Sequence, residues 1–249
     1  MKKFFKKLWT SFEDALFVNF DCMFCGVETL NESKVCPKCE SKLKFINGEV
    51  CETCGSPVEK SEKVCYNCFD KKYYFDKHRS CIIYDKLSSA PVRKLKYYKA
   101  KHLAEPVARF MFAVHKEIIK SADFITFVPI SDKRLEERGY NQTEEIAKYI
   151  NEISSVPVLK ILEKVKDTES QAELGFAERT KNLKGSFEIL ENAKQEIKGK
   201  NIVIVDDVFT TGSTSSECAR VLKKYKPKSV NVITFVKTDP NIEFEELPF

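Results

Sequence analysis

Long hydrophobic runs are absent from this sequence of 249 residues, and histidine, glycine and proline are scarce. Because a membrane-spanning helix needs roughly 20 consecutive apolar residues, we expect no integral membrane segment. The hydrophobic fraction of 43%, with only 8 glycines and 9 prolines, excludes a disordered chain, a collagen-like repeat and a pure coiled coil. The basic first residues contain no uninterrupted apolar region and no small-residue cleavage site, so we expect no signal peptide and a cytoplasmic protein.

Two common phosphate-binding patterns are also missing. Neither GxxxxGK[ST] nor GxGxxG occurs, which gives no support to a P-loop ATPase or a dinucleotide-binding fold. The three histidines, His78, His102 and His115, stand in no recognisable constellation, and we assign them no role. The length allows one large domain, or one domain with a small module.

The net charge of +5 is a weak indication of any partner, but its distribution is uneven. Residues 81–120 contain nine basic and three acidic residues, whereas the rest of the chain is close to balanced. This local excess is suited to binding an anion, and a solvated helix face is the alternative.

Eight of the ten cysteines form four CxxC pairs, and the spacing of the first four is repeated 29 residues later. Each quartet reads C-x2-C-x10-C-x2-C, which in a reducing compartment is typical of a closed, structural zinc site. We predict that sequential pairs share a metal, and disulfides are the alternative. The predicted zinc ligands are Cys22, Cys25, Cys36 and Cys39 in one site, and Cys51, Cys54, Cys65 and Cys68 in the other. The other two cysteines, Cys81 and Cys218, are expected in the core.

The chain is expected to divide into four segments. Residues 1–19 have hydrophobic side chains at helical spacing and predict an amphipathic helix. Residues 20–78 form the cysteine-rich module, which has too few apolar residues to fold without metal. Residues 79–240 alternate apolar strands with helices, which predicts a mostly parallel α/β sheet covered by helices on both faces, and residues 241–249 are a tail. The predicted strands are residues 81–84, 124–129, 156–162, 186–190, 201–205 and 229–236, and helices are expected to begin near Ser89, Pro106, Asn141 and Ser213.

The sharpest pattern is NIVIVDDVFTTGSTSSEC, residues 201–218. A buried strand leads to two adjacent carboxylates, Asp206 and Asp207, and a Thr/Gly/Ser loop then leads into a helix. The N-terminus of a helix presents free N–H groups and a partial positive charge to a phosphate, and Gly212 would allow close approach. Acids beside a phosphate site need a reason, and a ribose supplies one, because its vicinal hydroxyls donate hydrogen bonds to carboxylates.

The stretch VIVDDVFTTGST closely resembles the PRPP-binding motif of type I phosphoribosyltransferases. The resemblance implies that Asp206 and Asp207 hold the ribose hydroxyls of PRPP, or of a related ribose phosphate, and that Mg²⁺ bridges ribose and pyrophosphate. It assigns the 5′-phosphate to Thr210, Thr211, Gly212, Ser213 and Thr214. Residues 79–240 would then be a phosphoribosyltransferase-like domain, with a sheet of that type.

The double cysteine module ahead of this domain is similar to that of the ComF/GntX family, which is named for competence for DNA uptake. Three more stretches carry the resemblance over most of the chain: RLEERGYNQ (134–142), TESQAEL (168–174) and RTKNLKGSF (179–187). The chain departs from the family pattern at Lys-Val-Lys, residues 164–166, where an arginine is expected. The resemblance implies a role in natural competence, with other competence proteins as partners.

Several residues near the predicted site have both a functional and a plain structural interpretation. Arg134 and Arg138 follow strand 124–129, where they would clamp a pyrophosphate; solvated helix charges are the alternative. The candidate catalytic residues are Asp206, Asp207 and Arg138. Asn141 is expected to cap a helix. Residues 166–182 would form a mobile lid. The candidate lid contacts, which are otherwise ordinary loop residues, are Thr168, Gln171 and Arg179.

The segment RKLKYYKAKH, residues 93–102, mixes cations with aromatic side chains, as surfaces that bind single-stranded nucleic acid do. The alternative is an amphipathic helix with Leu95 and Tyr98 facing inward. The candidate DNA contacts are Arg93, Lys94, Lys96, Tyr97, Tyr98, Lys99 and Lys101.

Three functions remain open on the sequence. The first is a transferase that displaces pyrophosphate from PRPP with an acceptor that no residue identifies. The second is a non-catalytic factor that binds single-stranded DNA and whose PRPP pocket is regulatory or vestigial. The third is a structural adaptor, which an intact TTGST loop argues against.

Overall fold

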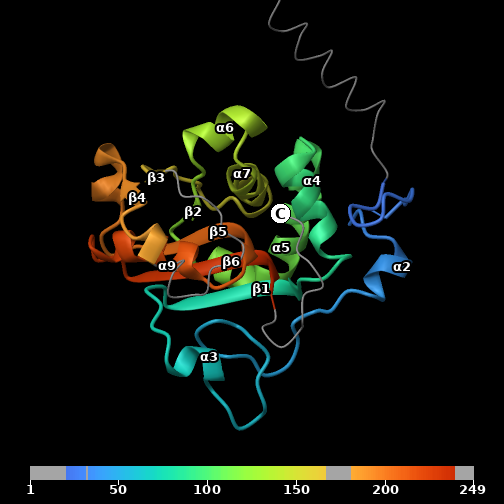
Figure 1. Cartoon of the computed structure of the whole chain (residues 1–249), viewed down its shortest axis with the longest axis horizontal. Helices are drawn as coiled ribbons and strands as arrows, with labels where there is room; N and C mark the ends of the chain where they lie inside the picture. Colours follow the sequence, from blue (N-terminus) through green and yellow to red (C-terminus); the bar gives the residue numbers. More distant parts are fainter. Residues whose placement is uncertain (1–20, 32, 167–180, 239–249) are drawn as a thin grey trace, which may run out of the picture.

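The computed structural model describes residues 21–31, 33–166 and 181–238. The expected N-terminal helix, the C-terminal tail and the three candidate lid contacts lie outside these residues. The central element is a parallel sheet of four strands in the order β1-β6-β5-β2 (Figure 1). Its strands are β1 (Lys77–Ile83), β2 (Phe124–Phe127), β5 (Asn201–Phe209) and β6 (Ser229–Lys237), and a separate antiparallel pair consists of β3 (Leu162–Lys164) and β4 (Phe187–Ile189).

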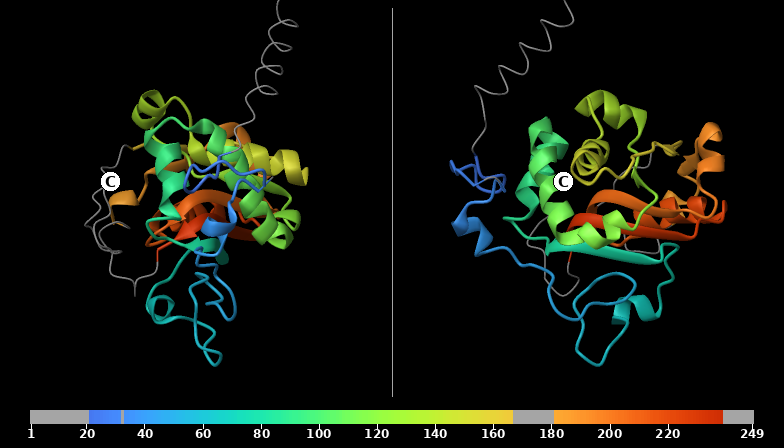
Figure 2. Two further views of the ribbon diagram at one scale, coloured as in Figure 1. Left: turned by 90° about the vertical axis from the view of Figure 1, so that its right-hand side faces the viewer. Right: turned by 180° about the vertical axis from the view of Figure 1, so that it is seen from behind.

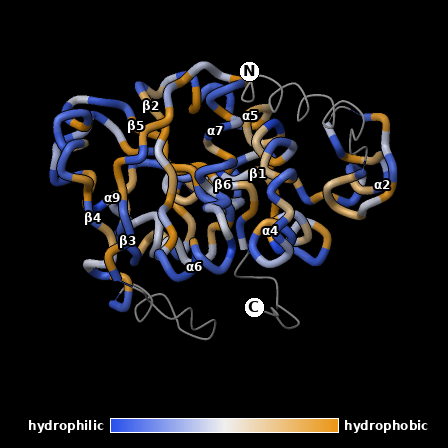
Figure 3. The backbone as a smooth tube through the Cα atoms, turned by 90° about the horizontal axis from the view of Figure 1, so that it is seen from above, coloured by the Kyte–Doolittle hydropathy of each residue, from blue (hydrophilic) through white to orange (hydrophobic). Residues whose placement is uncertain are grey.

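Helices cover both faces of the parallel sheet. Along β5, Val203 and Val205 pack into a core with helices α5 and α7, while Ile202 and Ile204 pack into a second core with α9. Hydrophobic residues accordingly concentrate along the inner strands, and hydrophilic ones in the outer turns (Figure 3). The predicted mostly parallel α/β sheet with helices on both faces is confirmed. The helices are α2 (Pro37–Glu40), α3 (Tyr66–Phe69), α4 (Ser89–Tyr97), α5 (Ala104–Lys120), α6 (Asp132–Arg138), α7 (Gln142–Ser154) and α9 (Ser213–Lys223), with 3-10 turns at Lys101–Leu103 and Glu191–Glu196.

Helix lengths also bear on the membrane question. Over the described ranges, no helix has the length and apolar character that crossing a bilayer requires, and α5 is 17 residues long.

The expected starts of α4, α7 and α9 agree with the structure to within a residue, and that of α5 to within two, because each lies at a local signal in the sequence.

The expected strand over residues 156–162 is wrong. Val158 makes a single parallel bridge to Ile125 of β2. The pairing does not extend in one direction because Pro157 has no N–H to donate to a neighbouring strand. At the other end, the carbonyl oxygen of Ile161 accepts a hydrogen bond from the amide of Leu190 and not from β2. Residues 186–190 do form a strand, β4, but it pairs with β3 outside the main sheet. Strand β5 is longer than expected, because β6 runs beside it as far as Phe209.

The cysteine module lies against the sheet domain on two sides. The part with α2 lies beside α4 and α5, and the part with α3 lies beyond the edge strand β1 (Figures 1 and 2). In the first part, Phe24 packs against Phe110, with ring centroids 6.4 Å apart, and against Phe235. In the second part, Cys54 and Phe75 belong to the core that includes α9. The module therefore contributes to both cores.

Candidate functional site

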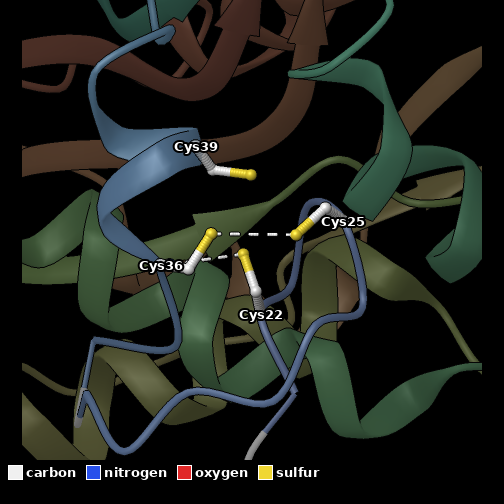
Figure 4. A group of neighbouring side chains, drawn as sticks. All are labelled: Cys22, Cys25, Cys36 and Cys39. Atoms are coloured by element: carbon white, nitrogen blue, oxygen red, sulfur yellow. Dashed lines mark hydrogen bonds between the residues drawn. The ribbon is translucent and has the colours of Figure 1, made fainter.

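The eight paired cysteines gather into two clusters, each with four sulfur atoms within 4.8 Å of one another. Residues of sequential CxxC pairs share a cluster, as predicted, and none of these cysteines forms a disulfide. Four thiolates around a tetrahedral zinc at about 2.3 Å lie about 3.8 Å from one another. The Sγ atoms of Cys25 and Cys36 are 3.7 Å apart (Figure 4), and those of Cys54 and Cys65 are 3.5 Å apart. Both clusters thus fit zinc, and the module has two zinc-binding sites, each of four cysteines, with no open position for catalysis.

Asp206 and Asp207 lie near the carboxyl end of β5 and are both buried. Because neighbouring residues of a strand face opposite sides of the sheet, the two carboxylates have different partners. Asp207 accepts a hydrogen bond from Nε2 of Gln142 at 2.9 Å and forms an ion pair with Nζ of Lys96 at 2.9 Å. Asp206 instead accepts a hydrogen bond from the amide of Asp207 and another from the side chain of Ser215 at the start of α9.

The surroundings of these carboxylates affect the charge of the site at neutral pH. Burial, together with the neighbouring carboxylate of Asp207, raises the pKa of Asp206 to about 7. Burial also acts to lower the pKa of Lys96, but its ion pair with Asp207 outweighs that effect and the pKa is raised. Lys96 therefore stays charged, and Asp206 titrates near neutral pH. A carboxyl group poised in this way is a common feature of functional sites.

The residues that follow β2 bring an arginine to the same place. Arg138, at the end of α6, donates a hydrogen bond to Oε1 of Gln142, so that Gln142 connects this guanidinium to Asp207. Arg134 lies one turn earlier on α6 and is half-buried. Asn141 accepts a hydrogen bond from the amide of Thr143 at 3.1 Å, which confirms it as the N-cap of α7. The stretch 134–142 thus builds one wall of the carboxylate site.

The loop between β5 and α9 has the form of an anion site. Helix α9 begins at Ser213, so the first amides of an 11-residue helix, with its positive dipole end, face the loop. Gly212 has a φ of +76°, and a Cβ there would lie 2.4 Å from the ring of Phe209. Only glycine fits this position, for both reasons. The hydroxyl oxygens of Thr211 and Ser213 are 2.9 Å apart and lie on this loop.

The candidate DNA contacts of the basic segment 93–102 do not lie on one surface. The amine of Lys96 lies at Asp207, and Lys101 forms an ion pair with Glu145 at 3.1 Å. Arg93, Lys94 and Tyr98 instead line an open cleft of about 1070 Å³ between the first zinc-binding site and helices α4 and α5. The remaining candidates, Tyr97 and Lys99, are exposed. Leu95 is buried, as the amphipathic alternative requires, but Tyr98 is 69% exposed and does not face inward.

The sequence did not predict the positions of three side chains, Gln142, Tyr73 and His78. Gln142 was part of a motif, but its hydrogen bond to Asp207 joins residues 65 positions apart. Tyr73 donates its hydroxyl to the carbonyl oxygen of Thr211 at 3.1 Å, across 138 positions. His78, which we assigned no role, is buried between the second zinc-binding site and β6. Local periodicity carries no signal for such long-range pairs.

Comparison with known families gives two matches. The model of the phosphoribosyl transferase domain matches residues 95–245, more than half of the chain, and that of the double zinc ribbon domain matches residues 12–69. The chain belongs to the phosphoribosyltransferase domain family. The expected combination of a double zinc ribbon with this domain is confirmed, and so is the sheet type.

This phosphoribosyltransferase-family chain is also similar to three named proteins over most of its length. It is 28% identical to Competence protein F of Haemophilus influenzae, over 87% of this chain and 96% of that protein. It is 26% identical to Competence protein ComFC of Bacillus subtilis, over 83% and 85% of the two chains. It is 25% identical to DNA utilization protein YhgH of Escherichia coli K12, over 87% and 96%.

Proposed function

We propose that the chain binds Mg²⁺-PRPP, or a related ribose phosphate, where β5 leads into α9. One observation carries this proposal: two buried carboxylates, Asp206 and Asp207, lie near the end of β5, just before a loop that presents the first amides of α9. The 5′-phosphate would lie on residues 210–214, and the carboxylates would accept hydrogen bonds from the ribose hydroxyls. Arg134 and Arg138 would face the pyrophosphate, because a guanidinium suits its charge and geometry.

Magnesium would enter this site with the ligand. Mg²⁺ prefers oxygen ligands and is usually held by one or two carboxylates together with phosphate oxygens, which Asp206, Asp207 and PRPP would supply. Bound Mg²⁺ would neutralise the charge of the pyrophosphate. The chain's own contribution is to orient the ribose through its two hydroxyls and to hold the phosphate at a helix N-terminus.

We further propose that the protein acts in DNA uptake or utilisation, in the cytoplasm. The support for the role is the similarity over most of the chain to proteins named for competence and for DNA utilization. The support for the compartment is chemical, because eight thiolates remain available to zinc only where thiols stay reduced. Ribose phosphate binding is compatible with a transferase and with a regulatory pocket alike.

Calorimetric titration with Mg²⁺-PRPP tests the binding proposal. We expect saturable binding by the wild type, and a loss of at least about tenfold in affinity for Asp207→Asn, because hydrogen bonds to charged groups contribute about 1.5–3 kcal/mol. Glu152→Gln is the matched control, since it changes the net charge equally at the exposed far end of α7. Equal affinities for the two variants would contradict the proposal. Release of pyrophosphate, followed with and without DNA, then separates a transferase from a binding protein.

A second candidate function is the binding of single-stranded DNA in the cleft beside the first zinc-binding site. The observation that favours it is the lining, in which cations such as Arg93 and Lys94 lie near the exposed ring of Tyr98. The variant Arg93→Ala/Lys94→Ala should weaken DNA binding and flatten its salt dependence. The control Lys116→Ala/Lys120→Ala removes two exposed charges from α5. Equal salt slopes in the two variants would contradict this function.

A further inference from the structure

A short segment of chain connects the second zinc-binding site to residues 210–214, which we call the phosphate loop because the proposed function places the 5′-phosphate there. Cys68 is the last ligand of that site, and Tyr73 follows five residues later. The hydroxyl of Tyr73 donates to the carbonyl oxygen of Thr211 at 3.1 Å, and the amide of Tyr74 donates to Oγ of Ser216 at 3.1 Å. The loop and the first turn of α9 are thus each tied to the end of the zinc module.

Aromatic packing reinforces these hydrogen bonds. Gly212 lies so close to the rings of Phe209 and Tyr73 that an added Cβ would be 2.4 Å and 2.8 Å from them. Tyr73 in turn stacks on Phe75, with ring centroids 4.8 Å apart. The turn that would receive a phosphate therefore rests on side chains of the segment that follows the last zinc ligand.

His78 makes a second connection between the same two places. Its Nδ1 lies 2.7 Å from the carbonyl oxygen of Cys54, and because a carbonyl only accepts, Nδ1 carries the proton. Its Nε2 then accepts from the hydroxyl of Thr234 at 2.9 Å. The imidazole stacks on Phe209 with centroids 3.8 Å apart. His78 therefore contacts the backbone of the zinc ligand Cys54 on one side and the ring of Phe209 on the other. That ring in turn lies against Gly212.

We propose that the second zinc-binding site positions the phosphate loop, through Tyr73 on one side and through His78 and Phe209 on the other. Zinc on the four cysteines of that site would hold Cys68, which precedes the segment 69–78, and also Cys54, whose carbonyl oxygen lies 2.7 Å from Nδ1 of His78 at the other end. Tyr73 and Phe209 then hold the turn at Gly212 in the shape that presents the amides of α9. The first zinc-binding site has a different environment, since its Phe24 packs on Phe110 and Phe235. The expected effect on ligand affinity rests on the proposed function, whereas the effect on the loop itself does not.

Two neighbouring tyrosines give a matched test. Tyr73→Phe removes only the hydroxyl that bonds to Thr211, and Tyr74→Phe removes the hydroxyl of a side chain that is 49% exposed. We expect Tyr73→Phe to bind ribose 5-phosphate about three- to tenfold more weakly than the wild type, the effect of one hydrogen bond, and Tyr74→Phe to bind like the wild type. Equal affinities for the two variants would overturn the proposal.

Hydrogen exchange of the backbone tests the same coupling without any ligand. The amides of residues 211–216 should exchange faster in Tyr73→Phe than in Tyr74→Phe, and faster when Cys65→Ser, rather than Cys36→Ser, has removed a zinc ligand. Zinc content is measured for each protein, and if a cysteine variant does not fold, the tyrosine pair decides. Equal exchange in the tyrosine pair would overturn the inference. If the wild type bound no ribose phosphate but the exchange difference were present, the proposed function would fail and this inference would stand.

Discussion

At the scale of single residues, the two carboxylates near the end of β5 are neighbours in sequence that differ in chemistry. Asp207 forms an ion pair with Lys96 and accepts a hydrogen bond from Gln142. Asp206 instead accepts hydrogen bonds from the backbone amide of Asp207 and from the hydroxyl of Ser215. Both oxygens of Asp207 have protein partners, but each carboxylate oxygen can accept a second hydrogen bond, so a ribose hydroxyl can bind there beside them. The side chain of Lys96 is 25% exposed and that of Asp207 is 5% exposed, so the pair lies at the boundary between the site and solvent.

The raised pKa of Asp206 predicts a pH dependence of stability. The folded chain keeps this proton up to about pH 7, whereas the unfolded chain releases it near the ordinary value of 3.8. Because the folded state binds more protons in this window, the free energy of unfolding contributed by Asp206 falls as the pH rises from about 4 to 7. Asp206→Asn should therefore be more stable than the wild type at pH 8, by about 1–3 kcal/mol.

Urea denaturation at pH 5 and pH 8, at fixed free zinc, measures this effect. The gain at pH 8 should shrink at pH 5 for Asp206→Asn. The exposed carboxylate of Asp132 provides the control, as Asp132→Asn should change stability little at either pH. A gain of the same size at both pH values would show that Asp206 is already ionised at pH 5.

The pair between Lys96 and Asp207 predicts a second effect. Lys96→Met leaves the carboxylate of Asp207 buried with one partner fewer, which should lower the free energy of unfolding by about 1–3 kcal/mol. Lys101→Met breaks the more exposed pair with Glu145 and should lower it by less than about 1 kcal/mol. Denaturant titration of both variants at pH 7 measures the difference. Losses of equal size would mean that burial of the Lys96 pair has no energetic weight.

At the scale of elements, the turn between β5 and α9 depends on one glycine. Gly212 and Gly199 both have positive φ, +76° and +72°, but an added Cβ is crowded only at Gly212. Gly199→Ala should lower the free energy of unfolding by about 1 kcal/mol, from backbone strain alone. Gly212→Ala should lower it by about 2–4 kcal/mol, since rings of Phe209 and Tyr73 must also move. Thermal unfolding of the two variants provides the comparison, and equal shifts would contradict the packing argument.

Elements with their own local signals were predictable, and those decided by distant partners were not. Asn141 caps α7 through its own side chain, so its sequence position was informative. Strand β5 extends past its apolar run to Phe209 because β6 pairs with Asp206 and the residues after it. The sequence predicted Lys96 as a cation on the surface, because its partner, Asp207, lies 111 positions further along the chain. The turn at Gly212 before α9 was predictable from a short motif, whereas its contact with Tyr73 of the zinc module was not.

At the scale of the whole molecule, the zinc module is a structural part of the sheet domain. Its first half adds Phe24 to the core with α5, and its second half adds Phe75 to the core with α9. Ile83 of the edge strand β1 also donates its amide to the carbonyl oxygen of Lys44 in the module, at 2.9 Å. A module joined to both cores in this way should share its stability with them.

Removal of zinc should therefore destabilise the whole chain. After chelation, we expect calorimetry to show a lower melting temperature for the main unfolding transition, because apolar surface on both faces of the sheet loses its cover. A tethered, independent module would behave differently, with its own transition lost and the main one unchanged. Readdition of zinc should restore the original temperature, which controls for irreversible damage.

The central claim is that a ribose phosphate binds where β5 leads into α9. A crystal structure of the zinc-loaded protein with ribose 5-phosphate at saturating concentration tests it most directly. We predict the phosphate on the amides of residues 211–214, and the ribose hydroxyls within hydrogen-bond distance of Asp206 or Asp207. A ligand bound elsewhere, or this turn empty at saturation, would contradict the account.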